Sequence, residues 1–112
     1  MKALETMQSN TQLTPWYVYM IETHCGKLYT GITVDVQRRF QEHCEVYSGV
    51  SAKGAKFFRG HEPKCLVLVE SCTSRSEASK RELQIKAMSR QAKKRLLDAD
   101  AGINYSSKKF QV

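Results

Sequence analysis

Two short runs of β-branched and aromatic residues, 16–21 and 28–33, constrain this fold more than any other part of the sequence. The segment between them contains Gly26 and polar residues, and this arrangement predicts a β-hairpin. The first run is apolar or aromatic on both of its alternating faces. A strand without a polar face is covered on both sides, so we expect residues 16–21 in the centre of a sheet.

A helix is expected directly after the hairpin, with Thr33 as its N-cap residue. Its apolar stripe, with members three or four residues apart, consists of Val36, Phe40, Cys44 and Tyr47. Arg39 and His43 lie one turn apart along one edge of that stripe. We therefore expect these two basic side chains to flank the buried face of the helix without lying at its centre.

The second half of the chain supplies a third strand and two more helices. The continuous apolar run 65–69 predicts a well-buried strand. Ser74 and Glu77 form a capping box at the start of a helix that is expected over 75–88. A last, short helix is expected over 90–97. The predicted order of elements is therefore β-β-α-β-α-α.

The length of 112 residues suits one domain with a modest core. We place this domain at 15–99, between a flexible arm at 1–14 and a tail at 100–112. No apolar run is long enough to span a membrane, and the start of the chain does not resemble a signal peptide. We expect a monomer in the cytoplasm, where its four cysteines would be reduced.

The net charge of +7 is unevenly distributed along the chain. Residues 16–46 carry a net charge of −1, whereas 47–64 and 65–100 carry +3 each. A basic surface on a small domain favours a polyphosphate partner, usually nucleic acid, although many basic proteins are simply well solvated. Charge alone leaves both interpretations open.

The segment 47–63 is expected to be a long loop with at most one helical turn. Lys53, Lys56 and Arg59 alternate there with glycines and two phenylalanines. Glycines let a phosphate approach the backbone closely, the cations supply charge, and exposed aromatic rings can stack on bases. We therefore predict that these three cations bind nucleic acid. In the alternative interpretation the loop is solvated, and its phenylalanines anchor it to the core.

Glu82 lies within the apolar arc of the helix 75–88, four residues after Ala78 and three before Ile85. Burying an unpaired carboxylate costs several kcal/mol, so this side chain needs a cation. That cation could be an arginine, a lysine or a metal ion. The residues alone leave open a salt bridge that holds the helix to the sheet and a metal site.

These groups match the needs of phosphodiester cleavage. The reaction needs a group that deprotonates water, a cation that neutralises the phosphate and usually a divalent metal ion at the leaving oxygen. Arg39 could hold phosphate oxygens in a fork. Glu82 could hold Mg²⁺ or Mn²⁺ through one carboxylate, with waters in the other positions. A strand tyrosine is an awkward base, because the ordinary pKa of tyrosine is about 10.

Two tripeptides of the hairpin are Tyr17-Val18-Tyr19 and Tyr29-Thr30-Gly31. They are followed, in order, by Arg39, His43 and Glu82. In order and spacing the set resembles the GIY-YIG nuclease family, and most closely its small stand-alone bacterial members. The resemblance covers about residues 15–97. Two positions depart from the motifs: Tyr17 stands in place of the first glycine, and Thr30 replaces the central residue of the second motif.

The resemblance implies an α+β fold, with a small three-stranded antiparallel sheet flanked by helices. It also implies roles for individual residues. Tyr29 corresponds to the proposed general base, and Tyr19 to the tyrosine that orders groups around the phosphate. Arg39 corresponds to the arginine that stabilises the transition state, and Glu82 to the single metal ligand. His43 matches a histidine that some members use near the scissile phosphate.

The leading hypothesis is therefore a divalent-metal-dependent endonuclease that hydrolyses phosphodiester bonds in DNA, branched or single-stranded, in repair or processing. No small-molecule cofactor is expected. The main alternative is a nucleic-acid-binding module of the same fold that cleaves weakly or not at all. A third hypothesis, from a different class, is an interaction domain whose basic face docks an acidic protein.

Overall fold

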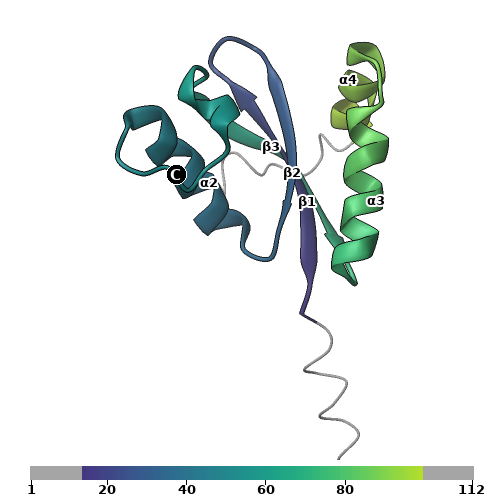
Figure 1. Ribbon diagram of the computed structural model, residues 1–112. Coiled ribbons are helices and arrows are strands. Elements are labelled where there is room, and N and C mark those ends of the chain that lie inside the picture. Colours follow the sequence, from purple (N-terminus) through teal and green to yellow (C-terminus); the bar gives the residue numbers. More distant parts are fainter. Residues whose placement is uncertain (1–13, 100–112) are drawn as a thin grey trace, which may run out of the picture.

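Three antiparallel strands form one sheet in the computed structural model, which describes residues 14–99 (Figure 1). The strands are β1 (Trp16–Thr23), β2 (Leu28–Thr33) and β3 (Pro63–Cys72), and their order in the sheet is β2-β1-β3. The central position predicted for the first strand is confirmed. The predicted tail lies outside the described residues, as does the predicted arm apart from Thr14. Over 14–99 no helix is long and apolar enough to cross a membrane.

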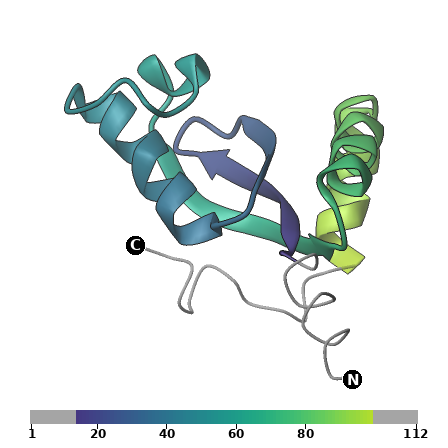
Figure 2. The same cartoon turned by 60° about the horizontal axis from the view of Figure 1, so that its bottom comes forward.

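Helices cover both faces of the sheet (Figures 1 and 2). One face carries α2 (Val36–Ser48) and the single turn η1 (Lys56–Arg59). The other face carries α3 (Arg75–Lys86) and α4 (Arg90–Ala99). The predicted α+β class and the order β-β-α-β-α-α are confirmed, with η1 as the helical turn of the long loop.

The hairpin register sets the positions of the two motif tyrosines. Tyr19 of β1 lies opposite Gly31 of β2, and Ile21 lies opposite Tyr29. The connecting turn contains Gly26 at φ 87°, a left-handed conformation that glycine adopts without steric cost. Tyr19 and Tyr29 therefore lie on neighbouring strands, two positions apart along the ladder.

The N-cap of α2 is Asp35, so the prediction of Thr33 was wrong. An Asp35 carboxylate oxygen accepts a hydrogen bond from the Arg38 amide at 3.0 Å. The Thr33 hydroxyl oxygen instead accepts from the Asp35 amide at 3.1 Å, which fixes the turn before the helix. Both side chains are cap formers, and Asp35 has the position because it directly precedes the first helical residue.

The start of α3 is capped nearly as predicted. The Ser74 hydroxyl accepts from the Glu77 amide at 3.1 Å, and the Glu77 carboxylate accepts from the Thr73 amide at 2.8 Å. The reciprocal bond therefore reaches one residue further back than a capping box requires. Ser89 caps α4 by accepting from the Ala92 amide at 3.0 Å.

The buried stripe of α2 differs from the predicted one. It consists of Val36, Phe40, His43 and Val46. His43 falls between Val46 and Val36 in helical angle and is fully buried, so it lies in the centre of the face and does not flank it. Tyr47 lies in the last turn and is 45% exposed. The loop at Gly54 packs instead on the Val46 side of that turn, so Val46 is buried in its place.

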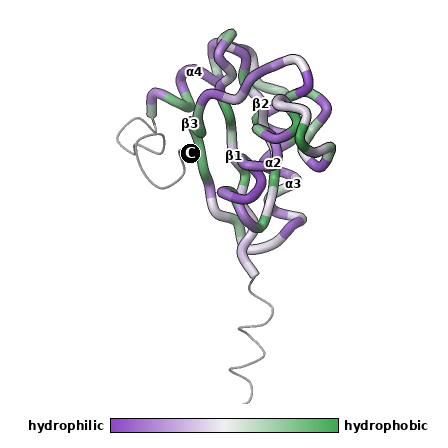
Figure 3. Tube along the Cα trace, turned by 90° about the vertical axis from the view of Figure 1, so that its left-hand side faces the viewer, coloured by the Kyte–Doolittle hydropathy of each residue, from purple (hydrophilic) through white to green (hydrophobic). Residues whose placement is uncertain are grey.

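Two hydrophobic clusters separate the helices from the sheet. The cluster under α2 and η1 contains Tyr19, Ile21, Val36, Phe40, Val46, Phe58 and Leu66. The cluster under α3 and α4 contains Val18, Met20, Leu68, Cys72, Ala78 and Ile85. Figure 3 shows the hydrophobic colour along β1 and β3, between helices that are mostly hydrophilic. Alternate residues of β1 thus supply both clusters, as expected for a central strand.

Candidate active site

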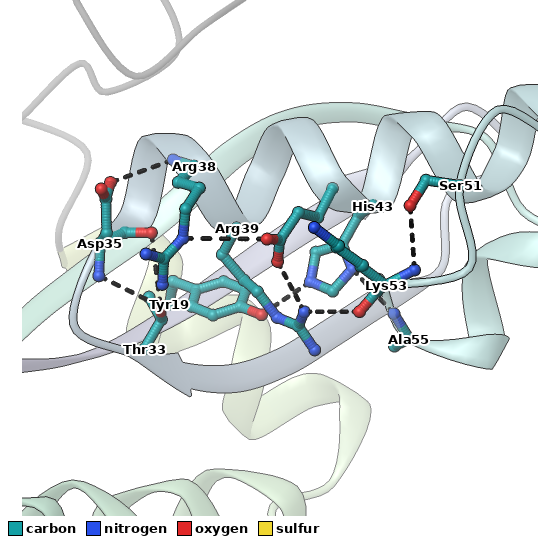
Figure 4. Close-up of polar contacts among 10 residues, drawn as sticks. Tyr19, Thr33, Asp35, Arg38, Arg39, His43, Ser51, Lys53 and Ala55 are labelled. Carbon is teal, nitrogen blue, oxygen red and sulfur yellow. Dashed lines mark hydrogen bonds and ion pairs between the residues drawn. The ribbon is translucent and has the colours of Figure 1, made fainter.

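A hydrogen-bonded chain links the central strand, α2 and the loop after it (Figure 4). The Tyr19 hydroxyl lies 2.8 Å from Nε2 of His43, and both side chains are buried. The backbone amide of Ala55 donates to Nδ1 of the same ring at 3.1 Å. A backbone N–H can only donate, so Nδ1 of His43 is unprotonated and the neutral ring carries its proton on Nε2. The imidazole therefore donates to the Tyr19 oxygen.

His43 is held in its neutral form. Burial and, secondarily, the positive charge of Arg39 lower the pKa of His43 to about 4, while Glu42 opposes them weakly. At neutral pH the ring therefore keeps the tautomer that the Ala55 amide requires. His43 orients Tyr19 and does not act as a surface base.

Gly31 explains the glycine of the second motif. A Cβ atom at this position would lie 2.6 Å from the Tyr19 hydroxyl oxygen and 2.8 Å from the ring carbon that bears it. Such distances are far inside van der Waals contact, and the ring is fixed by His43. Only glycine lets the Tyr19 hydroxyl lie against the backbone of the edge strand β2.

The Tyr19 phenol stays protonated. Burial is the main cause that raises its pKa, and the charges of Tyr29 and Glu82 raise it further, whereas Arg39 lowers it. A phenol with a raised pKa is a poor base. Because its oxygen already accepts a proton from His43, the hydroxyl proton of Tyr19 is available for an acceptor in the site.

Tyr29 lies beside Tyr19 in a cluster of aromatic rings. Its ring centroid is 5.3 Å from that of His43, 4.8 Å from Phe58 and 5.4 Å from Phe57. These contacts fix the direction of the ring. Unlike Tyr19, however, Tyr29 is only partly buried. Of the two motif tyrosines, it is the one that is partly exposed to water.

Arg39 is anchored at one end of its guanidinium group. Its Nη1 atom donates to the Glu42 carboxylate and to the Lys53 carbonyl, each at 2.8 Å (Figure 4). Burial lowers the pKa of Arg39, but the bond to Glu42 and the contact with Tyr19 outweigh it, and the pKa is raised. Both protons of Nη1 are used, so Nε and Nη2 remain for Tyr19 and for an incoming anion.

Glu82 lies on α3, which covers the face of the sheet opposite to α2. The side chain is 21% exposed, and its carboxylate pairs with Lys86 at 3.2 Å, one turn further along α3. The ion pair between helix and sheet is made by Arg81 with Glu70 of β3 instead, at 2.8 Å. Glu82 is thus less buried than predicted, and its cation comes from its own helix.

Arg39 and Glu82 both influence one ionisable group, the phenol of Tyr19. Both charges shift the pKa of Tyr19, in opposite directions, although their helices cover different faces of the sheet. The arrangement is possible because α3 packs against the edge strand β2, beside which Tyr19 lies. A cation and a carboxylate, on helices that cover opposite faces of the sheet, therefore both bear electrostatically on this phenol, and phosphodiester chemistry uses groups of both kinds.

A metal ion would have a single protein carboxylate here. Within residues 14–99 there is no group of three or more His, Cys, Asp or Glu that could form a closed metal site. Mg²⁺ and Mn²⁺ tolerate such sparse ligation, because they take oxygen ligands and Mg²⁺ keeps several waters. The half-exposed Lys86 is the cation that such an ion would displace from Glu82. The residues present therefore fit a hard divalent ion.

The loop after α2 is anchored by its aromatic rings. Phe58 is fully buried, and Phe57 is half-buried against the ring of His61. The expectation of exposed stacking rings is therefore wrong for Phe58, and here the anchoring alternative holds. Lys53, Lys56 and Arg59 are exposed, and none makes an ion pair with a residue that the structure describes. Their role in binding nucleic acid stays a prediction.

Two groups of the site, the Glu42 carboxylate and the Ala55 amide, were not predicted from the sequence. Glu42, which orients Arg39, could have been found from its spacing three residues after Arg39 on one helix. The Ala55 amide has no such signal, because a backbone donor leaves no trace in residue type. Gly54 is a partial clue, since a Cβ there would lie 2.6 Å from the Glu42 carbonyl oxygen, so glycine lets the loop approach α2.

Comparisons with known proteins show the family of the chain. The model of the GIY-YIG catalytic domain matches residues 15–95. The chain belongs to the GIY-YIG family. This is a family of nucleases that generally use a divalent metal ion.

Relatives of the chain are small bacterial GIY-YIG proteins of the UPF0213 group. The UPF0213 protein PA3854 of Pseudomonas aeruginosa is 46% identical over 82 residues, which are 73% of each chain. The UPF0213 protein YhbQ of Escherichia coli K12 is 42% identical over 90 residues, 80% of this chain and 84% of that one. The solution NMR structure of the UPF0213 protein BH0048 from Bacillus halodurans matches with a TM-score of 0.50 and 32% identity, over 84% of this chain and 94% of that one.

Proposed function

We propose that this GIY-YIG protein is a DNA endonuclease that uses Mg²⁺ or Mn²⁺ to hydrolyse phosphodiester bonds. One observation carries the proposal: the buried hydroxyl of Tyr19 is hydrogen-bonded to His43 beside the partly exposed ring of Tyr29, and the charges of Arg39 and Glu82 both bear on the Tyr19 pKa. A site with one hydrolytic centre cuts one strand per encounter. Such an activity suits the repair or processing of branched or single-stranded DNA.

Different residues of the chain take different roles in the proposed hydrolysis. The free edge of the Arg39 guanidinium binds two oxygens of the scissile phosphate. Tyr19 donates its hydroxyl proton to a phosphate oxygen, and His43 keeps it pointing there. Tyr29 accepts a proton from the attacking water. Glu82 would hold the divalent ion, which supplies positive charge to the leaving oxygen.

The test is a cleavage assay with purified protein on branched, single-stranded and duplex DNA, with Mg²⁺ or Mn²⁺. We expect Glu82→Gln to abolish cutting, because the amide is neutral and holds a divalent ion poorly. Glu62→Gln is the matched control, since Glu62 is an exposed carboxylate of the loop before β3. Equal cutting by wild type and the Glu82 variant would identify a contaminating nuclease and remove the proposal.

The silent binding module is the second candidate. The ion pair between Glu82 and Lys86 favours it, because a carboxylate already neutralised by lysine does not need a metal ion. It predicts DNA binding without cutting, with an affinity that falls steeply as salt is added. Neutralising Lys53, Lys56 and Arg59 together would weaken that binding. No DNA affinity even at low salt would exclude both candidates and leave the acidic-protein partner.

A further inference from the structure

A second basic feature lies beside the candidate active site, at the hairpin end of the sheet. It is a cavity of about 250 Å³, lined by Lys27, Leu28, Phe57, Arg90 and Lys93. These residues come from the turn and start of β2, from η1 and from α4. The Phe57 ring is 5.4 Å from that of Tyr29, so the cavity is separated from the candidate active site by one aromatic contact.

Three of the five lining side chains are cations. Lys27, Arg90 and Lys93 make no ion pair with any carboxylate of residues 14–99. Arg90 donates to the Gly26 carbonyl at 3.2 Å, which ties the start of α4 to the hairpin turn. Cations that converge on one hollow repel each other, and a bound anion relieves that repulsion. The cavity therefore favours a negatively charged ligand.

The other two lining residues are apolar. Phe57 is held by the His61 ring, which stacks on it at 4.3 Å with an interplanar angle of 8°, and by Phe58, which meets it edge-on at 5.0 Å. Leu28 supplies the aliphatic part of the wall. A fixed aromatic ring next to cations is the combination that binds an unpaired base together with its phosphates. The volume lies just below the range of about 300 to 1,000 Å³ for small-molecule sites, which suits one nucleotide.

We propose that this cavity holds one unpaired nucleotide of the DNA strand, next to the phosphate that is cleaved. Its base lies against Phe57 and Leu28, and its phosphates contact Lys27, Arg90 and Lys93. A fully paired duplex keeps its bases stacked inside the helix, so it cannot place a base there. The inference rests on the proposed function and adds the place where the substrate is recognised: a cavity that takes an unpaired nucleotide at the cut.

The test measures binding separately from cleavage. In the Glu82→Gln background, fluorescence anisotropy reports the affinity for a labelled single-stranded oligonucleotide and for a duplex of the same length. We expect Lys27→Gln, Arg90→Gln and Lys93→Gln combined to weaken single-strand binding by at least tenfold. The slope of log affinity against log salt should fall by about 2, or about 0.7 for each lost phosphate contact.

Lys94→Gln is the matched control, because Lys94 is an exposed lysine of the same helix that does not line the cavity. It removes the same charge as Lys93→Gln and should change the affinity by no more than about twofold. Phe57→Leu should weaken single-strand binding by about tenfold. Phe57→Trp keeps an aromatic ring and should bind single strands with about the wild-type affinity. Thermal unfolding of each variant checks that η1 still packs on the core.

Equal losses for Lys93→Gln and Lys94→Gln would overturn the site, because general surface charge would then explain the binding. Equal losses for single strand and duplex would overturn the unpaired nucleotide. The outcome is independent of cutting. If the wild type does not cleave but the cavity variants lose single-strand affinity, the nuclease proposal fails and this site stands. If the wild type cleaves and the cavity variants bind normally, the nuclease proposal stands and the nucleotide site in the cavity fails.

Discussion

The two faces of the sheet are built from alternate residues of the same central strand, yet they differ in kind. Towards α3 and α4, β1 presents Val18 and Met20 to a cluster that is almost wholly aliphatic. Towards α2 and η1 it presents Tyr19, which lies among aromatic rings and the buried His43. One face is an ordinary hydrophobic core, whereas the other holds both a hydrophobic core and the candidate active site.

This difference teaches where buried polar groups are tolerated. His43 and Tyr19 are buried without penalty because each ring nitrogen and the phenol oxygen has a partner. From the aliphatic face, only Glu82 belongs to the candidate site. It lies at the margin of its helix, where its carboxylate is partly exposed to water. The site therefore depends on a satisfied polar core on one side and on a single outlying carboxylate on the other.

The largest effect is expected from a change that leaves both cores intact. Arg39→Lys keeps the charge but removes the fork that binds two phosphate oxygens. We expect the rate of cleavage to fall by about 100- to 1,000-fold, with little change in thermal stability. Arg38→Ala, at the exposed neighbouring position, is the control and should cut at close to the wild-type rate. Normal cutting by Arg39→Lys would show that the arginine contributes charge alone.

The aliphatic face should respond in the opposite way. Ile85→Ala removes a fully buried side chain and should lower the free energy of unfolding by about 3 kcal/mol. The fraction that remains folded should cleave at the wild-type rate, because Ile85 packs in the hydrophobic cluster under α3 and α4, away from Tyr19 and Arg39. Leu83→Ala, at a position that is 66% exposed, should cost less than about 0.5 kcal/mol in urea unfolding. A catalytic defect specific to Ile85→Ala would mean that the two faces are coupled.

Acid should destabilise the polar face. The pKa of His43 is about 4 in the folded chain and near 6.5 when unfolded, so the unfolded state binds more protons between these values. The contribution of the neutral His43 ring to the free energy of unfolding is fully present above pH 6.5. It is lost as the pH falls towards 4, by about 2 to 3 kcal/mol. Urea unfolding across this range, compared with His43→Gln, isolates the contribution from those of the carboxylates. Parallel curves for the two proteins would contradict a buried neutral His43.

A smaller effect is expected where the polar face meets the edge strand. Gly31→Ala places a methyl group 2.6 Å from the Tyr19 oxygen and should cost about 1 to 2 kcal/mol. Tyr19→Phe in the same chain removes that oxygen and should recover part of the loss. A double-mutant cycle by urea unfolding measures the coupling. Strict additivity of the two changes would show that the phenol moves away freely.

The sequence predicted most of the architecture, whereas the roles of the site residues stay predictions. Periodicity placed β1 in the centre, and the family motifs pointed to Tyr19, Tyr29, Arg39 and Glu82. It failed where the outcome depended on contacts between distant segments. His43 was expected at the edge of α2, because the covering loop and its Ala55 amide could not be inferred from residue types.

The cavity at the hairpin turn shows the same limit of sequence patterns. Its lining comes from positions as far apart as Lys27 and Lys93, and no local pattern connects them. The cap of α2 failed for a different reason. Two suitable residues, Thr33 and Asp35, stood close together, and only the backbone conformation decides between them.

The hydrogen bonds that run from the Ala55 amide through His43 to Tyr19 have a fixed polarity. The peptide group at their origin cannot reverse its role, so every later member accepts on one side and donates on the other. The last donor is the Tyr19 hydroxyl, and only a group with lone pairs can accept its proton. A phosphate oxygen can therefore accept the hydroxyl proton of Tyr19, while the second lone pair of the Tyr19 oxygen can accept from a cation such as Arg39.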